Sequence, residues 1–283
     1  MPGRGMEAMV EEEFVLEDNE FRKIAKLVMD TAGIVLSEKK RAFIHGRLGR
    51  RLRALGLADF GQYCRLLETD RGDQERANLI NAVTTNHTSF FREKHHFDYL
   101  TKVVLPKLVE SNAASRRIRI WSAGCSSGEE PYTIAMTLRG HHPPLTGWNV
   151  KILATDLDTN VVSHAATGVY AEDRIEGIPD TYRKRYVTRH RDGHAMMKDE
   201  LRELITFAHL NLLGEWPMSG PFDLIFCRNV VIYFDKPTQR RLFDRYAEML
   251  RPDGWLFIGH SESLLNVTDR FEPVGRTIYR RIR

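Results

Sequence analysis

Residues 118–133 read IRIWSAGCSSGEEPYT, and this stretch indicates both a fold class and a kind of ligand. The β-branched and aromatic residues at 118–121 predict a short strand, which runs into a loop of small residues. The loop meets a helix that begins with Glu129, Glu130 and Pro131. Proline suits the first turn of a helix because the first N–H groups have no intrahelical partner. A strand, a loop of small residues and a helix N-terminus form the nucleotide-binding turn of doubly wound sheets.

The two glutamates argue against a phosphate ligand at this turn. A pyrophosphate prefers bare N–H groups at a helix N-terminus. The G-x-G-x-x-G fingerprint is also absent, because three residues separate Gly124 from Gly128. A ligand with a positive group fits better, and S-adenosylmethionine is a nucleoside with an ammonium and a sulfonium but no phosphate. The alternative is an ordinary strand–helix turn in which Glu129 and Glu130 favour the helix dipole.

A second acidic position supports the cofactor interpretation. Residues 149–155, NVKILAT, predict a strand, and Asp156 follows it directly. An acidic residue at the end of the second strand of a doubly wound sheet hydrogen-bonds ribose hydroxyls. Asp156 lies 26 positions after Glu130, which leaves room for one helix and one strand. The two acids together favour a cofactor over an ordinary turn.

The composition predicts a soluble globular protein of one large or two smaller domains. The chain has 283 residues, of which 42% are hydrophobic and 10% aromatic. It shows no membrane-length apolar run and no secretory h-region in MPGRGMEAMVEEEF, so we expect a cytoplasmic protein. The three widely spaced cysteines suggest neither a disulfide framework nor a metal site. The adjacent pairs His95–His96 and His141–His142 also predict no metal, because neighbours on a helix point to different sides.

The pattern along the chain predicts a small all-helical domain followed by a doubly wound, mostly parallel α/β domain. We expect a flexible N-terminus over 1–18, helices over 19–92 and a helical linker over 93–117. From residue 118 strands alternate with helices, which is typical of a parallel sheet with helices on both faces. The predicted strands are 118–122, 149–155, 205–209, 222–227, 254–259 and 276–282, and the predicted helices are 129–139, 159–167 and 236–250. Residues 186–210 predict a small antiparallel β appendage around a turn at Asp192 and Gly193.

Five segments, in this order and spacing, resemble one family. They are TTNHTSFFR (84–92), WSAGCSSGEEPY (121–132), LATDLD (153–158), PFDLIFCRNVVIYFD (221–235) and LRPDGWLFIGHSE (250–262). The set resembles the CheR family of chemotaxis receptor methyltransferases, which are protein-glutamate O-methyltransferases. The resemblance extends from about residue 19 to the end. It implies a helical N-terminal domain and an S-adenosylmethionine domain, residues 118–283, that carries a three-stranded β subdomain.

The resemblance also implies a function and its partners. The enzyme would transfer a methyl group from S-adenosylmethionine to glutamate side chains on the cytoplasmic helices of chemoreceptors, leaving S-adenosylhomocysteine. We therefore expect methyl-accepting chemotaxis receptors as partners, no nucleic acid, no membrane insertion and a monomeric protein. In some members the β subdomain binds a receptor tail. The turn region RHRDGHAMMKDE (189–200) is compact and polar here, so we expect no tail tether.

The matched positions supply the predicted site. In the family, Glu130 corresponds to the acid that holds the methionine ammonium and Asp156 to the ribose acid. The remaining cofactor positions are Asn86, Thr88 and Arg92 before the sheet domain, Asn211 and Leu212 beside the adenine, and Arg228 and Asn229 near the transferred methyl.

Arg92 and Tyr233 are the predicted catalytic residues. A glutamate carboxylate is ionised at neutral pH and needs no general base, so catalysis would come from alignment of the two reactants. Arg92 could orient the carboxylate, since a guanidinium binds two oxygens at once, and the Tyr233 hydroxyl could lie beside the sulfonium. The alternatives are a surface charge for Arg92 and a core aromatic for Tyr233.

A basic helix could dock the substrate. Residues 37–67 hold eight lysines or arginines against two acids, and Lys40, Arg47, Arg50 and Arg51 form the predicted docking set for an acidic helical partner. A solvated helix face is the plain alternative. Nucleic acid is a third, but the net charge is only +4 and no aromatics are interleaved for base stacking.

Two other functions remain as alternatives at this stage. An RNA methyltransferase often carries Asn-Pro-Pro-Tyr after the fourth strand, whereas this chain has NVVIY at 229–233. A silent adaptor that senses S-adenosylmethionine is the other, and the presence of Arg92, Asp156 and Tyr233 argues against it.

Overall fold

The computed structural model describes residues 14–189 and 193–283, which form two compact units. The first unit comprises the described residues up to Thr31 together with Val35–Val83, and the second comprises Ala32–Ile34 and Thr84–Arg283. The predicted boundary at residue 92 differs from this division, and the predicted linker, 93–117, belongs to the second unit. Most of the predicted flexible N-terminus lies outside the described residues, and the first helix already begins at Asp18.

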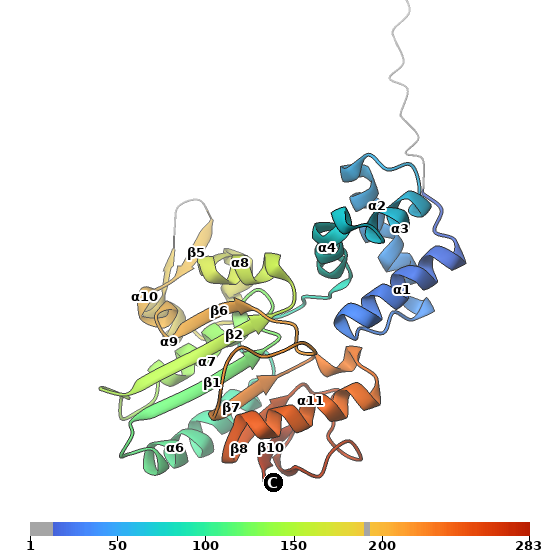
Figure 1. Ribbon diagram of the computed structural model, residues 1–283. Helices are drawn as coiled ribbons and strands as arrows, with labels where there is room; N and C mark the ends of the chain where they lie inside the picture. Colours follow the sequence, from blue (N-terminus) through green and yellow to red (C-terminus); the bar gives the residue numbers. More distant parts are fainter. Residues whose placement is uncertain (1–13, 190–192) are drawn as a thin grey trace, which may run out of the picture. The chain divides into compact units, whose positions relative to one another are not determined.

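The first unit is all-helical, as the sequence predicts (Figure 1). Its helices are α1 (Asp18–Ala32), α2 (Arg41–Leu55), α3 (Phe60–Leu67) and α4 (Asp73–Val83), with short 3-10 turns at Glu38–Lys40 and Asp70–Gly72. Asp59 caps α3, because its carboxylate accepts a hydrogen bond from the backbone N–H of Gln62 at 2.6 Å. Each helix buries apolar side chains at helical spacing, among them Ile24, Leu48 and Leu79.

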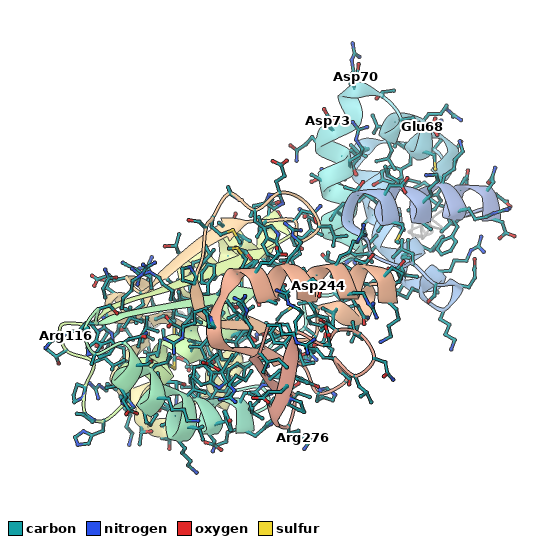
Figure 2. All side chains as sticks on the ribbon, turned by 60° about the horizontal axis from the view of Figure 1, so that its bottom comes forward. Glu68, Asp70, Asp73, Arg116, Asp244 and Arg276 are labelled. Atoms are coloured by element: carbon teal, nitrogen blue, oxygen red, sulfur yellow. The ribbon has the colours of Figure 1, made fainter. Side chains whose placement is uncertain are left out.

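Three acidic residues lie close together on the surface of this unit. Glu68, Asp70 and Asp73 gather where α3 ends and α4 begins (Figure 2). The predicted docking residues lie instead on α2 and on the turn before it.

A buried carboxylate joins α2, α3 and α4. Glu75 is only 5% exposed. It accepts hydrogen bonds from Arg51 Nε at 3.0 Å and Nη2 at 2.5 Å, from the Tyr63 hydroxyl at 3.0 Å and from Asn78 Nδ2 at 3.0 Å. Burial raises the pKa of Glu75, but the hydrogen bonds from Arg51, Asn78 and Tyr63 outweigh it and lower the pKa overall. Arg51, predicted to dock a partner, thus has an internal partner in Glu75, and its role in docking stays a prediction.

The second unit is built on a seven-stranded sheet in the order β6-β2-β1-β7-β8-β10-β9 (Figure 1). The strands are β1 (Arg117–Ala123), β2 (Asn149–Asp156), β6 (Ile205–His209), β7 (Phe222–Cys227), β8 (Leu250–Ile258), β9 (Phe271–Gly275) and β10 (Ile278–Arg281). The pairs among β6, β2, β1, β7 and β8 are parallel, whereas β10 pairs antiparallel with β8 and β9. The predicted doubly wound, mostly parallel sheet is confirmed, and all six predicted strands are present.

Alternating side chains on the central strands enter two separate cores. Ile120 on β1 and Phe226 on β7 belong to the core that includes Leu100, whereas Trp121 belongs to the core that includes Phe243. The first core is covered by α7 (Glu129–Arg139) and by a continuous helical stretch of α5 (His95–Tyr99), a π-helical turn (Leu100–Val104) and α6 (Leu105–Ser111). The second core is covered by α11 (Lys236–Met249). Helices on both faces leave the strand ends as the place for a site.

A small antiparallel sheet in the order β3-β5-β4 forms the appendage. Its strands are β3 (Val169–Ala171), β4 (Val187–Arg189) and β5 (His194–Met197). The prediction for 186–210 needs two corrections, because β3 precedes that range and 205–209 lies in the main sheet as β6. Asp192 in the predicted turn lies outside the described residues.

Shorter helices complete the second unit. They are α8 (Thr159–Thr167), α9 (Asp180–Tyr186) and α10 (Asp199–Arg202), with 3-10 turns at Glu172–Gly177 and Val231–Tyr233. Within 14–189 and 193–283, no helix combines the length and apolar character needed to cross a bilayer.

We expect Glu75→Gln to destabilise the first unit by about 1–3 kcal/mol, because Arg51 and Tyr63 lose a charged buried acceptor. Glu38→Gln is the matched control: its pair with Arg41, at 3.1 Å, is exposed and contributes at most about 1 kcal/mol. Urea unfolding followed by circular dichroism measures both. A carboxylate with a lowered pKa stabilises the fold above its unfolded pKa, so the difference between parent and Glu75→Gln should shrink as the pH falls through the folded pKa. Equal effects of the two variants would contradict the structural role of Glu75.

Candidate functional site

The candidate site lies where β1, β2 and β7 end, along the carboxyl-terminal edge of the parallel strands. Residues 124–128 link β1 to α7. Gly128 precedes α7 with φ +97°, and a Cβ there would lie 2.7 Å from the Tyr170 hydroxyl and 2.8 Å from the Ala165 Cβ. Only glycine fits that position, so the tight turn predicted from the sequence is present.

Asp156 holds the loop against the end of β2. Its carboxylate accepts hydrogen bonds from the backbone N–H groups of Ser126 at 2.7 Å and Asp158 at 3.0 Å. Burial raises the pKa of Asp156, and these two N–H groups oppose the rise. The predicted ribose acid is therefore a buried, fixed carboxylate beside the loop.

Asp158 is a site residue to which the sequence analysis gave no role. It caps α8 by accepting from the backbone N–H of Asn160 at 2.9 Å. Its other oxygen accepts from Asn86 Nδ2 at 2.7 Å and from Thr84 Oγ1 at 3.2 Å. The Ser126 hydroxyl in turn donates to the Asn86 carbonyl at 2.9 Å. These bonds place the segment that begins at Thr84 beside the loop. The sequence feature that could have identified Asp158 is its position as the second acid of LATDLD, directly before a helix.

The structure separates the two glutamates at the start of α7. Glu129 is fully buried, forms an ion pair with Arg174 and accepts from the Ser127 hydroxyl at 2.7 Å. Arg174 also donates to the Thr88 carbonyl at 3.2 Å. Glu130 keeps 8% exposure and accepts from the Ser122 hydroxyl at 2.7 Å. Of the two, Glu130 is the one that a ligand can reach.

Arg228, which follows β7 directly, is the buried cation of the site. Its side chain is 3% exposed. Nη1 donates to Glu130 Oε2 at 3.0 Å, Nη2 donates to the Arg92 carbonyl, and Nη2 lies 3.4 Å from Glu93 Oε2. Burial raises the pKa of Glu130, while Arg228 and then Ser122 oppose the rise. Arg228 thus joins the predicted ammonium acid to the segment that carries Arg92.

Glu262 fixes the loop after β7 and was missed in the sequence analysis. Its carboxylate accepts from the backbone N–H groups of Asn229 at 2.9 Å, Val231 at 2.9 Å and Gly259 at 2.6 Å. Burial raises its pKa, and these N–H groups oppose the rise. A Cβ at Gly259 would lie 2.7 Å from the Asn229 nitrogen, so glycine is required. This anchor sets the position of Asn229 and of the half-buried Tyr233.

The other predicted residues fall in two places. Asn211 and Leu212 follow β6, whose last residue, His209, lies opposite Asp156, so they reach the same edge. Arg92 is half-buried, and its Nη1 donates to the His87 carbonyl at 2.8 Å. Lys40, Arg47, Arg50 and Arg51 belong to the first unit and are not part of this edge.

The charges at this edge fit a cationic nucleoside. Glu129, Glu130, Asp156 and Asp158 are all buried there. A buried carboxylate is costly unless positive groups or hydrogen-bond donors surround it. An ammonium and a sulfonium would supply positive charge, whereas a phosphate would add negative charge.

Comparisons with known proteins agree with this geometry. Residues 19–84 match the family model described as "CheR methyltransferase, all-alpha domain" and residues 86–280 match "CheR methyltransferase, SAM binding domain". A chemotaxis protein methyltransferase of Escherichia coli is 42% identical over 273 residues, which cover 95% of this chain and 92% of that protein. One from Borreliella burgdorferi is 44% identical over 250 residues, covering 87% and 88% of the two chains. A probable chemotaxis protein methyltransferase of Rhizobium etli is 41% identical over 258 residues, covering 90% and 96%.

The two family models meet at residues 84–86, next to the division between Val83 and Thr84 in the structure. The second unit is therefore an S-adenosylmethionine-binding methyltransferase domain, and the expectation of this cofactor is confirmed. The chain belongs to the CheR family of chemotaxis protein methyltransferases.

Proposed function

We propose that this protein methylates glutamate side chains on the cytoplasmic helices of chemoreceptors. The products would be glutamate methyl esters and S-adenosylhomocysteine, and the enzyme would act as a cytoplasmic monomer. The names of the relatives support the chemotaxis setting. The substrate class is the part of the proposal that requires an experiment.

The bridge made by Arg228 is the observation that carries the proposal. One guanidinium binds Glu130 through Nη1 and the Arg92 carbonyl through Nη2. The acid proposed for the methionine ammonium and the arginine proposed for the substrate carboxylate therefore belong to one hydrogen-bonded group. Such a group would hold the two reactants in a fixed relation, and well-aligned reactants can lower a barrier by about 7–11 kcal/mol.

The residues present suit a carboxylate nucleophile. Bound S-adenosylmethionine supplies an electrophilic methyl group on a sulfonium. A substrate glutamate has an ordinary pKa near ~4.3, so its oxygen attacks without prior loss of a proton. Arg92 would orient that carboxylate, and Tyr233, at the end of the turn fixed by Glu262, would lie beside the reacting methyl.

The proposed docking surface contains fewer residues than the set predicted from the sequence. Arg51 is removed because it binds Glu75. Arg47 donates to the Ala82 carbonyl at 3.0 Å and lies over the Phe43 ring, and Lys40 is partly buried, which lowers its pKa. Arg50 is exposed on α2, so it is the best position for testing contact with an acidic helical partner.

Radiolabelled methyl transfer to chemoreceptor-containing membranes tests the substrate class. A glutamate ester releases methanol in alkali, so we expect base-labile label on receptor protein. Tyr233→Phe should slow the transfer while the affinity for S-adenosylmethionine stays within about twofold, because a group acting on the reacting atoms affects turnover. Label that resists alkali, or label found in nucleic acid, would overturn the proposal.

Two ligands can separate the roles of Glu130 and Asp156. S-adenosylmethionine carries the ammonium, whereas 5′-methylthioadenosine has the same nucleoside without the amino acid. We expect Glu130→Gln to weaken only S-adenosylmethionine, and Asp156→Asn to weaken both, each by about 1–3 kcal/mol, or roughly 5- to 150-fold. Titration calorimetry measures the four affinities, and Asp269→Asn, an exposed site, is the control. Equal losses for both ligands in Glu130→Gln would remove the ammonium role.

Arg50→Glu should lower the receptor methylation rate about fivefold at low salt and leave cofactor affinity unchanged, because it reverses one exposed charge at the proposed docking surface. The effect should fade as salt is added, since exposed charges are screened over about 8–10 Å at physiological ionic strength. Arg65→Glu, exposed on α3 of the same unit, is the matched control. If both variants behave alike, α2 is a solvated face.

A further inference from the structure

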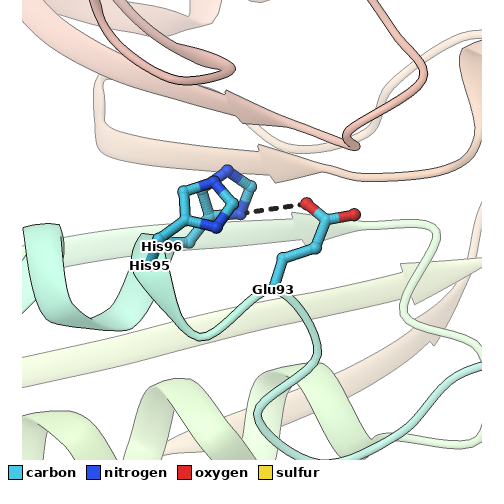
Figure 3. Close-up of side chains that lie close together, drawn as sticks. All are labelled: Glu93, His95 and His96. Atoms are coloured by element: carbon cyan, nitrogen blue, oxygen red, sulfur yellow. Dashed lines mark ion pairs between the residues drawn. The ribbon is translucent and has the colours of Figure 1, made fainter.

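A cluster beside the cofactor edge brings Glu93, His95 and His96 together (Figure 3). Each residue offers one ligand atom, and these atoms lie within 4.8 Å of one another. The sequence analysis expected no metal site here because neighbours on a helix diverge. The two rings nevertheless approach to 4.2 Å between centroids at the start of α5, and Glu93, two residues before His95, completes the group.

Two electron-pair donors face each other inside this cluster. His96 is fully buried and Glu93 has a 10% exposed side chain. Within the described part of the chain, His96 Nδ1 and Glu93 Oε2 are buried atoms without a hydrogen-bond partner, and they lie 3.5 Å apart. Unpaired buried polar atoms are rare and require an explanation.

The hydrogen bonds around Thr277 indicate which ring nitrogen of His96 carries the proton. Its Nε2 lies 2.9 Å from Thr277 Oγ1, and that hydroxyl donates its own hydrogen to the Arg276 carbonyl at 2.7 Å. Nε2 is therefore the donor, which leaves Nδ1 of a neutral ring as a bare lone pair. A lone pair and a carboxylate oxygen then face each other with no hydrogen between them.

Hydrogen bonds to neighbouring residues occupy the second polar atom of each of these side chains, as in established metal sites. His95 Nε2 lies 3.2 Å from the Arg276 carbonyl, which leaves Nδ1 available for a ligand bond. Arg276 and Thr277 belong to the turn between β9 and β10, where Figure 2 labels Arg276. Glu93 Oε1 is held by His260 through Nδ1 at 2.8 Å and the backbone N–H at 3.1 Å, so Oε2 remains. Metal-binding histidines donate their other N–H to oxygen acceptors in this way.

We propose that Glu93, His95 and His96 form a binding site for a divalent late first-row metal ion such as Zn²⁺. Two imidazoles and one carboxylate with an open fourth position is an established zinc ligand set. Zinc–ligand bonds of 2.0–2.2 Å at tetrahedral angles place neighbouring ligand atoms about 3.4 Å apart, close to the 3.5 Å between His96 Nδ1 and Glu93 Oε2. Ca²⁺ and Mg²⁺ prefer all-oxygen ligands and fit less well.

Arg228 is the charge that opposes a metal here. Its Nη2 lies 3.4 Å from Glu93 Oε2, but it also has Glu130 and the Arg92 carbonyl as partners. Burial raises the pKa of Glu93, yet Arg228 and His260 outweigh it and lower the pKa to about 2.

Titration of the metal-free full-length protein with Co²⁺ tests the site. Four-coordinate Co²⁺ has intense visible bands, and we expect such bands to appear at one equivalent and to vanish when Zn²⁺ is added. His95→Gln should weaken Co²⁺ binding at least tenfold without changing thermal stability in the absence of metal. The matched control is His142→Gln, an exposed member of the other histidine pair. Bands that are absent, or equal in both variants, would overturn the proposal.

Nitrogen-15 NMR of the histidine rings gives an independent measurement. At neutral pH the metal-free protein should show His96 neutral with its proton on Nε2, and Zn²⁺ should shift the Nδ1 resonance. A His96 ring protonated on both nitrogens would mean that Nδ1 donates to Glu93 and that the site is closed to metals. That result would overturn the proposal even if His95→Gln failed to fold.

Discussion

The site depends on one buried cation, the guanidinium of Arg228. A buried charge is tolerated only when opposite charges and hydrogen bonds surround it. Arg228 has Glu130 and Glu93 as counter-charges, the Arg92 carbonyl as a neutral acceptor and the Phe97 ring at 5.6 Å from its carbon. Glu130 comes from the start of α7, whereas Arg92, Glu93 and Phe97 come from the segment 92–97, so this single group fixes the relation between the end of β7, the start of α7 and that segment.

Glu262 does the complementary work as a buried anion. It binds three backbone N–H groups around the end of β7, so its partners are dipoles and not a second charge. Glu262 can therefore hold the loop in one conformation without a cationic partner. The ion pairs of Arg228 and the backbone hydrogen bonds of Glu262 together preorganise the residues expected near the reacting methyl.

Local patterns predicted the fold well, and long-range partners explain what was missed. The boundaries of α7 and α8 agree with the predicted 129–139 and 159–167, because caps and strand ends next to them mark where each helix begins. Strand β9 was missed because it contains Pro273, and it tolerates that proline as the last strand of the sheet. Arg51 and Glu75 are 24 positions apart, and Glu93 and His260 are 167 apart. No sequence periodicity reports such pairs, so the internal role of Arg51 and the cluster at Glu93 required the structure.

An excess of buried acid at the sheet edge connects the cofactor site with the proposed metal site. The buried Glu129, Glu130, Asp156 and Asp158, together with the partly buried Glu93, outnumber the guanidinium groups of Arg174 and Arg228 that neutralise them. Hydrogen bonds from backbone N–H groups stabilise Asp156 and Asp158, but burial still raises the pKa of Glu130 and Asp156. A ligand that brings positive charge relieves this cost, whereas a phosphate increases it. The same physical reason favours a sulfonium nucleoside over a dinucleotide at the cofactor site, and at Glu93 it favours the proposed metal ion as a second cation beside Arg228.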